Sequence, residues 1–156
     1  MRRNDREITD KIEIVEIIKK CDVCRLAFFY DDFPYIVPMN FGFVVNNDEI
    51  TLYFHCANEG KKLDALKANN HVCFEMDCSH RLVEAKLACN YTMEYESIIG
   101  NGLIEIVKKE DKIEALTFIM KKYSDTPNLE FEEKYVNAIS ILKLRVDNIT
   151  AKRLKK

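Results

Sequence analysis

The sequence predicts a small, mainly β barrel of six or so antiparallel strands with a few helices, in a single domain spanning residues 1–156. Strand-like runs alternate with turn-forming clusters along most of the chain. Hydrophobic residues make up 47% of the sequence, and nine Phe and seven Tyr stand against four Gly and three Pro, as in compact, strand-rich proteins. A chain of 156 residues buries roughly 70% of the surface that it exposes when unfolded, which is enough for a full core.

The first helix is predicted by a capping signal followed by helical spacing. Asp10 can accept hydrogen bonds from first-turn amides, and Glu13 three residues later completes a capping-box pattern. Apolar residues then recur at helical spacing, at Ile14, Ile17 and Ile18. We expect this helix to continue to about Lys20.

Three β-type runs follow, at residues 23–30, 35–45 and 49–55. Turn-forming clusters separate them, so the runs predict an antiparallel meander. Pro38 lies inside the second run and cannot donate a ladder hydrogen bond. At this point the strand should therefore be an edge, a bulge or an opening toward a ligand.

The second half of the chain predicts two further helices and three further strands. We expect helices at residues 60–68 and 109–123, and strands at residues 71–76, 92–107 and 138–146. The sequence Gly100-Asn101-Gly102 interrupts the longest strand and predicts a bulge or tight bend in a curved sheet. Residues 83–90 show no clear pattern, and residues 128–134 are typical of a loop or short helix.

The most informative stretch covers residues 52–66, where an apolar strand enters a polar loop and then a helix. The loop begins at His55, and the helix begins at Gly60, Lys61 and Lys62. First-turn N–H groups lack partners and carry a partial positive charge, so two lysines there are unfavourable for the helix itself. This placement predicts a pocket for a phosphate or another dianion.

The composition argues against several classes of protein. The net charge is −2, and the short basic clusters at both termini are typical of solvated tails rather than a nucleic-acid site. No apolar run reaches the eighteen or so residues of a membrane span, and residues 1–10 are too charged for a signal peptide. We therefore expect a cytoplasmic protein with six reduced cysteines, of which Cys24, Cys73 and Cys89 lie in apolar, strand-like surroundings.

Other motifs carry weaker signals. The pair Cys21-x-x-Cys24 lacks a second pair of matching spacing, so buried thiols are favoured over a zinc site. Further potential ligands of such a site are His71, Cys73, Cys78 and His80. Gly100-x-Gly102 is too short for a dinucleotide-binding loop, and no Ser, His and Asp form a recognisable nucleophile elbow.

Four segments in order carry a resemblance to a known family. They are P-Y-I-V-P-M-N-F-G at residues 34–42, L-Y-F-H-C-A-N-E-G-K-K-L-D-A-L at 52–66, H-V-C-F-E-M-D at 71–77 and Y-E-S-I-I-G-N-G at 95–102. The chain resembles the flavin-binding split-barrel superfamily of pyridoxamine 5′-phosphate oxidase, and within it the 5-nitroimidazole-resistance branch. It lacks the further basic residues that the oxidases proper carry on the ring-binding strand, which argues against synthesis of pyridoxal phosphate.

The resemblance implies a six-stranded antiparallel split β-barrel with flanking α-helices, and a homodimer with two FMN molecules at the subunit interface. The isoalloxazine ring would lie along Val37, Pro38, Met39, Asn40 and Phe41. The phosphate would lie near His55, Gly60, Lys61 and Lys62. The strand segment Tyr95, Glu96 and Ser97 would complete the site, from the partner chain.

These features favour an FMN-dependent oxidoreductase. The flavin would take hydride or electrons from a nicotinamide and pass them to a small electrophile such as a nitroaromatic, with His55 as the proton donor. The alternative is a flavin or haem carrier or sensor without turnover, for which potential axial ligands are His55, His71, Cys56 and Cys73. A zinc-stapled structural protein is the third interpretation. No nicotinamide-binding motif is present, so the electron donor stays open.

Overall fold

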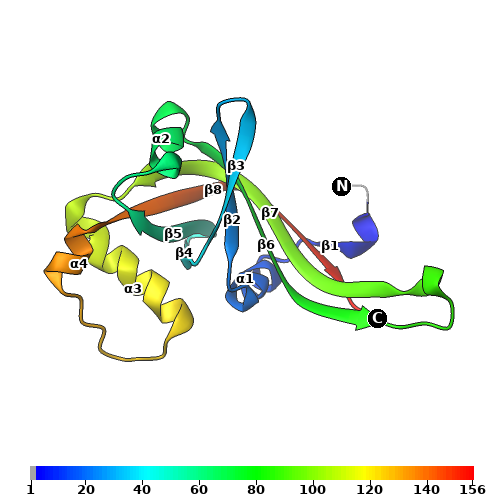
Figure 1. Cartoon of the computed structure of the whole chain (residues 1–156). Helices are drawn as coiled ribbons and strands as arrows, with labels where there is room; N and C mark the ends of the chain where they lie inside the picture. Colours follow the sequence, from blue (N-terminus) through cyan, green and yellow to red (C-terminus); the bar gives the residue numbers. More distant parts are fainter. Residues whose placement is uncertain (1–2) are drawn as a thin grey trace.

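A computed structural model describes residues 3–156, and Met1 and Arg2 lie outside the described residues (Figure 1). Antiparallel strands form one sheet in the order β3-β2-β6-β7-β8-β5-β4, with β1 paired to β8. The strands are β1 (Glu7–Ile8), β2 (Cys24–Tyr30), β3 (Phe33–Met39), β4 (Gly42–Asn46), β5 (Glu49–Ala57), β6 (His71–Val83), β7 (Thr92–Ile106) and β8 (Ile139–Leu154). The helices are α1 (Lys11–Lys20), α2 (Lys61–Ala68), α3 (Lys112–Tyr123) and α4 (Glu133–Asn137), with 3-10 turns η1 (Asn4–Arg6), η2 (Ala88–Asn90) and η3 (Lys109–Asp111).

The sheet is a split barrel because its two outermost strands are consecutive in the chain. Only Asn40 and Phe41 separate β3 from β4, although these strands stand at opposite ends of the strand order. The sheet must therefore curl until its edges approach each other. The mainly β, antiparallel class with flanking helices is confirmed.

The strand count differs from the six that we expected, because the sheet has eight strands. The expected strand at residues 35–45 divides at Asn40 and Phe41 into β3, which pairs with β2, and β4, which pairs with β5. The two-residue β1 adds the eighth strand. Pro38 lies on β3, an edge strand, in agreement with the edge position that the proline predicts.

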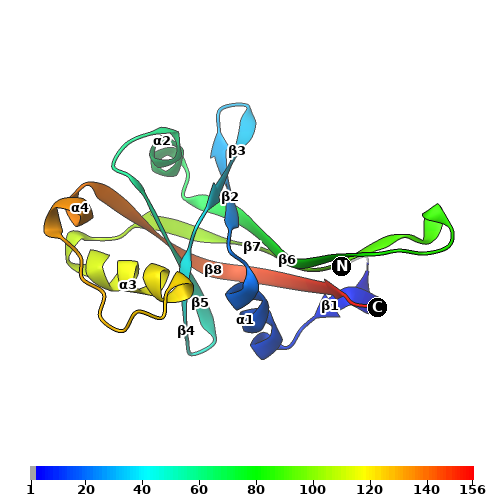
Figure 2. The same cartoon turned by 60° about the horizontal axis from the view of Figure 1, so that its bottom comes forward.

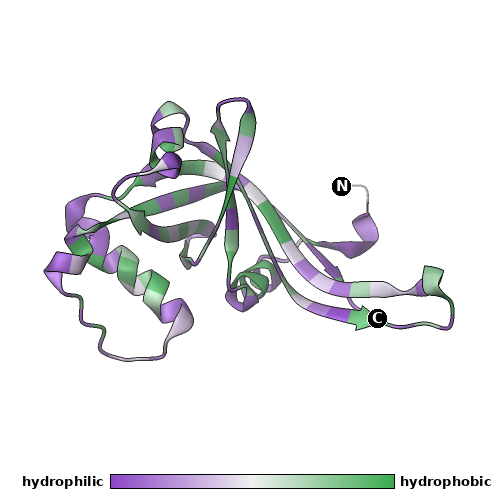
Figure 3. Cartoon of the chain, viewed as in Figure 1, coloured by the Kyte–Doolittle hydropathy of each residue, from purple (hydrophilic) through white to green (hydrophobic). Residues whose placement is uncertain are grey.

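The helices cover the two sides of the barrel unequally. Figures 1 and 2 place α2 beside the β2–β3 hairpin, while α1 and α3 lie on the other side. Alternating residues of β5 bury Leu52 and Phe54 in the main core, and Tyr53 packs instead against a smaller cluster under α3. Figure 3 shows the same alternation of hydrophilic and hydrophobic residues along the strands near α3.

The predicted starts of the first two helices and the predicted bulge are confirmed, whereas α3 begins at Lys112, after the 3-10 turn η3, rather than at residue 109. Asp10 caps α1 by accepting from the amides of Ile12 and Glu13 at 2.7 and 3.2 Å, and α2 starts directly after Gly60. The pairing of β7 with β8 shifts its register between Asn101 and Gly102. A Cβ on Gly102 would lie 2.0 Å from a backbone carbonyl oxygen of β8, so glycine is required there.

The structure corrects the prediction that the basic carboxyl terminus is a solvated tail. Strand β8 continues to Leu154, and Lys152 and Arg153 are residues of its ladder with β7. Ion pairs hold this segment in the sheet, because Arg153 donates hydrogen bonds to the carboxylates of Glu96 on β7 and Glu13 on α1. Sequence alone gives no sign of these partners, since they are distant along the chain.

Two of the cysteines that we expected in apolar surroundings are exposed. Cys73 lies on the outward face of β6, and Cys89 lies in the turn η2 at the tip of the β6–β7 hairpin, whereas Cys24 is buried. All six cysteines are free thiols. Within residues 3–156, no three or more His, Cys, Asp or Glu side chains gather as a metal site would require.

No helix in the described range 3–156 combines the length and the apolar character needed to cross a membrane.

Candidate functional site

The start of α2 presents open backbone amides and two lysines. Gly60 has φ 119°, in the region that favours glycine. The first helical hydrogen bonds run from Leu63 and Asp64 to the Gly60 carbonyl at 2.9 and 3.3 Å, and no side chain in the described part of the chain caps the amides before them. A Cβ built on Gly60 would meet nothing within 4 Å, so backbone conformation rather than lack of space favours glycine at this position.

The side chain of Lys61 contacts two aromatic rings of the β2–β3 hairpin. Its ammonium lies 4.2 Å from the centroid of the Tyr30 ring and 4.8 Å from that of the Tyr35 ring. The two rings come from neighbouring strands and their centroids are 6.2 Å apart. The fold therefore joins the lysine of the helix start to the strand on which we expect the flavin ring.

Lys62 lies at the other side of the same turn, near the end of β5. Burial raises the pKa of the Cys56 thiol, and the positive charge of Lys62 partly offsets this effect. The loop between β5 and α2 is fixed by Asn58, whose amide donates to the Asn137 carbonyl at 2.9 Å and accepts from the Ser140 hydroxyl at 2.8 Å. The loop that presents both lysines is thus anchored to the start of β8.

His55 is exposed near the end of β5, opposite Ile141 of β8. The alternation of the strand puts it on the face of Tyr53, which stacks on Phe118 of α3 at 5.2 Å and 27°, whereas Cys56 faces the main core. Within one chain, His55 and the pair of tyrosines that hold Lys61 therefore lie on different faces of their strands.

The expected ring-binding segment is an edge strand followed by a tightly held corner. Along β3, Val37 and Met39 face the main core, and Pro38 faces outward. At the corner, the Asn40 amide donates to the Asp22 carbonyl at 3.2 Å. The buried Phe41 donates its N–H to the Tyr123 hydroxyl at 3.0 Å, so this amide already has a partner.

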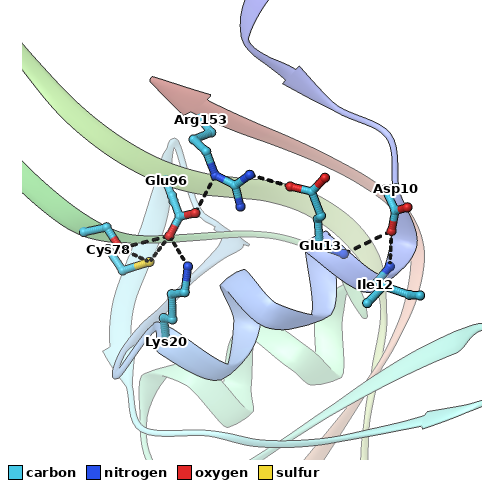
Figure 4. Close-up of polar contacts among 8 residues, drawn as sticks. Asp10, Ile12, Glu13, Lys20, Cys78, Glu96 and Arg153 are labelled. Atoms are coloured by element: carbon cyan, nitrogen blue, oxygen red, sulfur yellow. Dashed lines mark hydrogen bonds and ion pairs between the residues drawn. The ribbon is translucent and has the colours of Figure 1, made fainter. Parts of the chain in front are cut away.

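Glu96 lies elsewhere, in a network that joins β7 to α1 and β8 (Figure 4). Its carboxylate is 5% exposed and accepts hydrogen bonds from Arg153 Nε at 2.6 Å, Lys20 at 2.8 Å and the Ser79 hydroxyl at 2.9 Å. Arg153 also pairs with Glu13. Glu13 thus serves this network rather than reaching back to cap α1.

The charge of Glu96 is strongly favoured. Burial opposes its ionisation, but the hydrogen bonds from Lys20, Arg153 and Ser79 outweigh that cost and lower the pKa of Glu96 to about 2. A pocket of about 380 Å³ opens beside the network, lined among others by Glu94, Tyr95 and Lys155.

Ser97 follows on the opposite face of β7, between Asp77 of β6 and Lys152 of β8. A single chain therefore gathers the start of α2 and the β2–β3 hairpin into one place. It holds Glu96 against α1 and Ser97 on the reverse face of that strand. The sequence did not predict the roles of Tyr30, Asn58 and Tyr123, which hold Lys61, the loop before α2 and the Phe41 amide. The one local signal was the position of Tyr30 directly before Asp31 and Asp32, which form the turn of the β2–β3 hairpin.

Together, these elements form a split barrel with an uncapped, lysine-bearing helix start beside an edge strand. A model of the pyridoxamine 5′-phosphate oxidase family matches residues 10–153. The chain belongs to the pyridoxamine 5′-phosphate oxidase family, in its 5-nitroimidazole-resistance branch.

Solved structures agree with this assignment. The chain is similar to a candidate 5-nitroimidazole antibiotic resistance protein from Bacteroides thetaiotaomicron VPI-5482, with 35% identity over 94% of this chain and 86% of that one, and a TM-score of 0.80. The FAD and haem binding protein from Mycobacterium smegmatis has 18% identity over 97% of this chain and 74% of that one, with a TM-score of 0.85. A flavocytochrome from Azotobacter vinelandii has 18% identity over 100% and 72%, with a TM-score of 0.83. No curated protein matches the chain.

Proposed function

We propose that the protein binds FMN, with the phosphate at the start of α2 and the ring along β3. The observation that carries this proposal is the pairing of Lys61 and Lys62 with uncapped amides, next to an edge strand. Helix starts with free N–H groups bind phosphates readily, and the lysines add charge where the helix alone would disfavour it.

The residues of this chain fit a flavin in three ways. The first-turn amides after Gly60 receive no side-chain cap. The free edge of β3 offers main-chain donors and acceptors to a flat ring, and the outward-facing Pro38 supplies contact surface beside it, whereas Val37 packs against the core. When bound, a flavin supplies transfer of hydride or single electrons, and the protein supplies orientation.

We propose that the site is completed in a homodimer. The β2–β3 hairpin exposes three large apolar side chains beside the proposed site: Phe29 at 63%, Phe33 at 79% and Ile36 at 60% exposure. Such a patch is expensive to leave in water and is typical of an interface. In this dimer, Ser97 and His55 are available to the partner's flavin, whereas Glu96 keeps its partners within its own chain.

The proposed reaction is flavin-dependent reduction of a small electrophile such as a nitroaromatic, in the cytoplasm, with a nicotinamide as electron donor. The similarity to a candidate 5-nitroimidazole antibiotic resistance protein supports this substrate class. His55 is the proposed proton donor, because it is exposed and, in the proposed dimer, is available to the partner's flavin.

The absorption spectrum of the purified protein, with mass spectrometry of the material released on denaturation, tests the proposal. We expect flavin bands and FMN. Colourless protein that shows no saturable quenching of flavin fluorescence would refute the proposal. Release of FAD instead of FMN would show that the bound flavin is FAD. Reduction by NAD(P)H and reoxidation by a nitro compound then test turnover, with His55→Ala expected to slow only the protonation-dependent step.

A carrier or sensor without turnover is the second candidate. The two structures of proteins that bind flavin and haem share the fold, and His55 and His71 are both exposed here. A haem Soret band after reconstitution that disappears in His55→Ala or His71→Ala would favour this alternative. A Soret band that is unchanged in both variants would exclude His55 and His71 as haem ligands.

A further inference from the structure

Lys61 is held in place by two aromatic rings before any ligand binds. Its ammonium lies 4.2 Å from the Tyr30 centroid and 4.8 Å from the Tyr35 centroid, and the rings are inclined to each other by 55°. Tyr30 ends β2 and Tyr35 belongs to β3, so both rings are fixed by strands. Both rings are half-buried, while Lys61 itself is exposed.

This arrangement requires a physical explanation, because the positive end of the helix dipole disfavours an ordered ammonium at the first turn. A free lysine side chain samples many rotamers, and fixing it has an entropic cost. The negative face of an aromatic ring attracts an ammonium within about 6 Å of its centroid. The two rings thus hold the charge beside the first-turn amides, against the direction of the helix dipole.

We infer that Tyr30 and Tyr35 are positioning residues that set Lys61 for the phosphate of the flavin. This inference rests on the proposed function. The ammonium keeps its ring contacts on one side and offers its remaining hydrogen-bond donors on the other. Because the side chain is ordered in advance, less entropy is lost when the phosphate binds.

The inference predicts an effect that depends on the phosphate. An exposed contact between a cation and one ring corresponds to about a two- to fivefold change in affinity. We therefore expect Tyr30→Leu and Tyr35→Leu each to weaken FMN binding about two- to fivefold, and the double variant about 4–25-fold. Binding of riboflavin, which lacks the phosphate, should not change. Tyr30→Phe and Tyr35→Phe keep the ring faces and should bind FMN normally.

Calorimetric titration of the full-length protein with FMN and riboflavin tests this, in the presence and absence of Lys61→Ala. If the tyrosines act through the lysine, their replacement should have no further effect in the Lys61→Ala background. Tyr135→Leu is the matched control, because Lys134 lies over that ring at 6.0 Å and this contact involves neither Lys61 nor the β2–β3 hairpin. Thermal unfolding of every variant checks that the barrel is intact.

A second measurement needs no flavin. Ring currents should shift the ε-methylene protons of Lys61 upfield in the NMR spectrum of the ligand-free protein, and the shift should disappear in the Tyr30→Leu/Tyr35→Leu variant. The same protons in Tyr135→Leu should not move.

The outcomes separate this inference from the function on which it rests. Wild-type protein that binds FMN no more tightly than riboflavin would overturn the phosphate site and this inference together. Preference for FMN that survives unchanged in the leucine variants would overturn only the role of the tyrosines. Equal weakening of FMN and riboflavin would also overturn it, because the rings would then support the fold or the flavin ring rather than Lys61.

Discussion

Replacing Glu96 by glutamine should lower the stability of the barrel at neutral pH. The carboxylate is 5% exposed and receives hydrogen bonds from Lys20, Arg153 and Ser79. These bonds lower its pKa from 4.5 to about 2 despite the cost of burial. At 1.36 kcal/mol per pH unit this shift sets an upper bound of about 3 kcal/mol, and because the Lys20 and Arg153 side chains are 48% and 30% exposed, solvent screening reduces the stabilisation by ionised Glu96 to about 1–2 kcal/mol.

The sign of the pH dependence follows from the direction of that change. The folded protein holds the proton of Glu96 less tightly than the unfolded chain, so the stabilisation is complete above about pH 5 and is lost as the pH falls toward 2. Glu96→Gln imitates the protonated form at every pH. The difference in unfolding free energy between wild type and variant should therefore be about 1–2 kcal/mol at pH 7 and should shrink below pH 4.

Urea unfolding followed by circular dichroism at several pH values and one protein concentration measures this difference. Glu84→Gln is the matched control, because Glu84 is exposed in the loop between β6 and β7 and the change in net charge is the same. If Glu96→Gln and Glu84→Gln have the same unfolding free energy at pH 7, the Glu96 network does not stabilise the barrel. A difference that persists undiminished at pH 2.5 would also refute the reasoning.

Three further substitutions test the fold around the site. Tyr123→Phe removes a hydroxyl that donates to the Asp22 carbonyl at 2.7 Å and accepts from the Phe41 amide, and urea unfolding should show a loss of about 1–3 kcal/mol; a loss below 0.5 kcal/mol would contradict the role of this bond. Gly102→Ala should cost about 3 kcal/mol or prevent folding, because its Cβ would lie 2.0 Å from a carbonyl oxygen, and wild-type thermal stability would contradict this. Gly60→Ala should cost about 1–3 kcal/mol through backbone strain alone, with native far-UV circular dichroism; an unchanged melting temperature would show that the loop relaxes.

Local signals predicted the elements that depend on a few neighbouring residues. Asp10 marks the start of α1 because its carboxylate reaches amides two and three residues away. Gly60 marks the start of α2 because only glycine readily adopts its backbone angles. The pairing of Lys61 and Lys62 with that helix start was predictable for the same reason.

Features that depend on distant partners were not predictable. Whether residues 35–45 form one strand or two is decided by pairing, since β3 finds β2 and β4 finds β5. The sequence around Arg153 is typical of a solvated tail, yet in the fold Arg153 bridges Glu13 and Glu96. The ring contacts of Lys61 depend on a hairpin some thirty residues earlier in the chain.

The proposed function requires that the start of α2 holds the phosphate of a flavin. Lys61→Glu/Lys62→Glu reverses the charge of that site while leaving the packed residues of the helix in place. Fluorescence titration of this variant with FMN, alongside wild type, is the most direct test. We expect the variant to lose flavin while its circular dichroism spectrum stays that of the wild-type barrel. A folded variant that binds FMN as tightly as the wild type would contradict the claim.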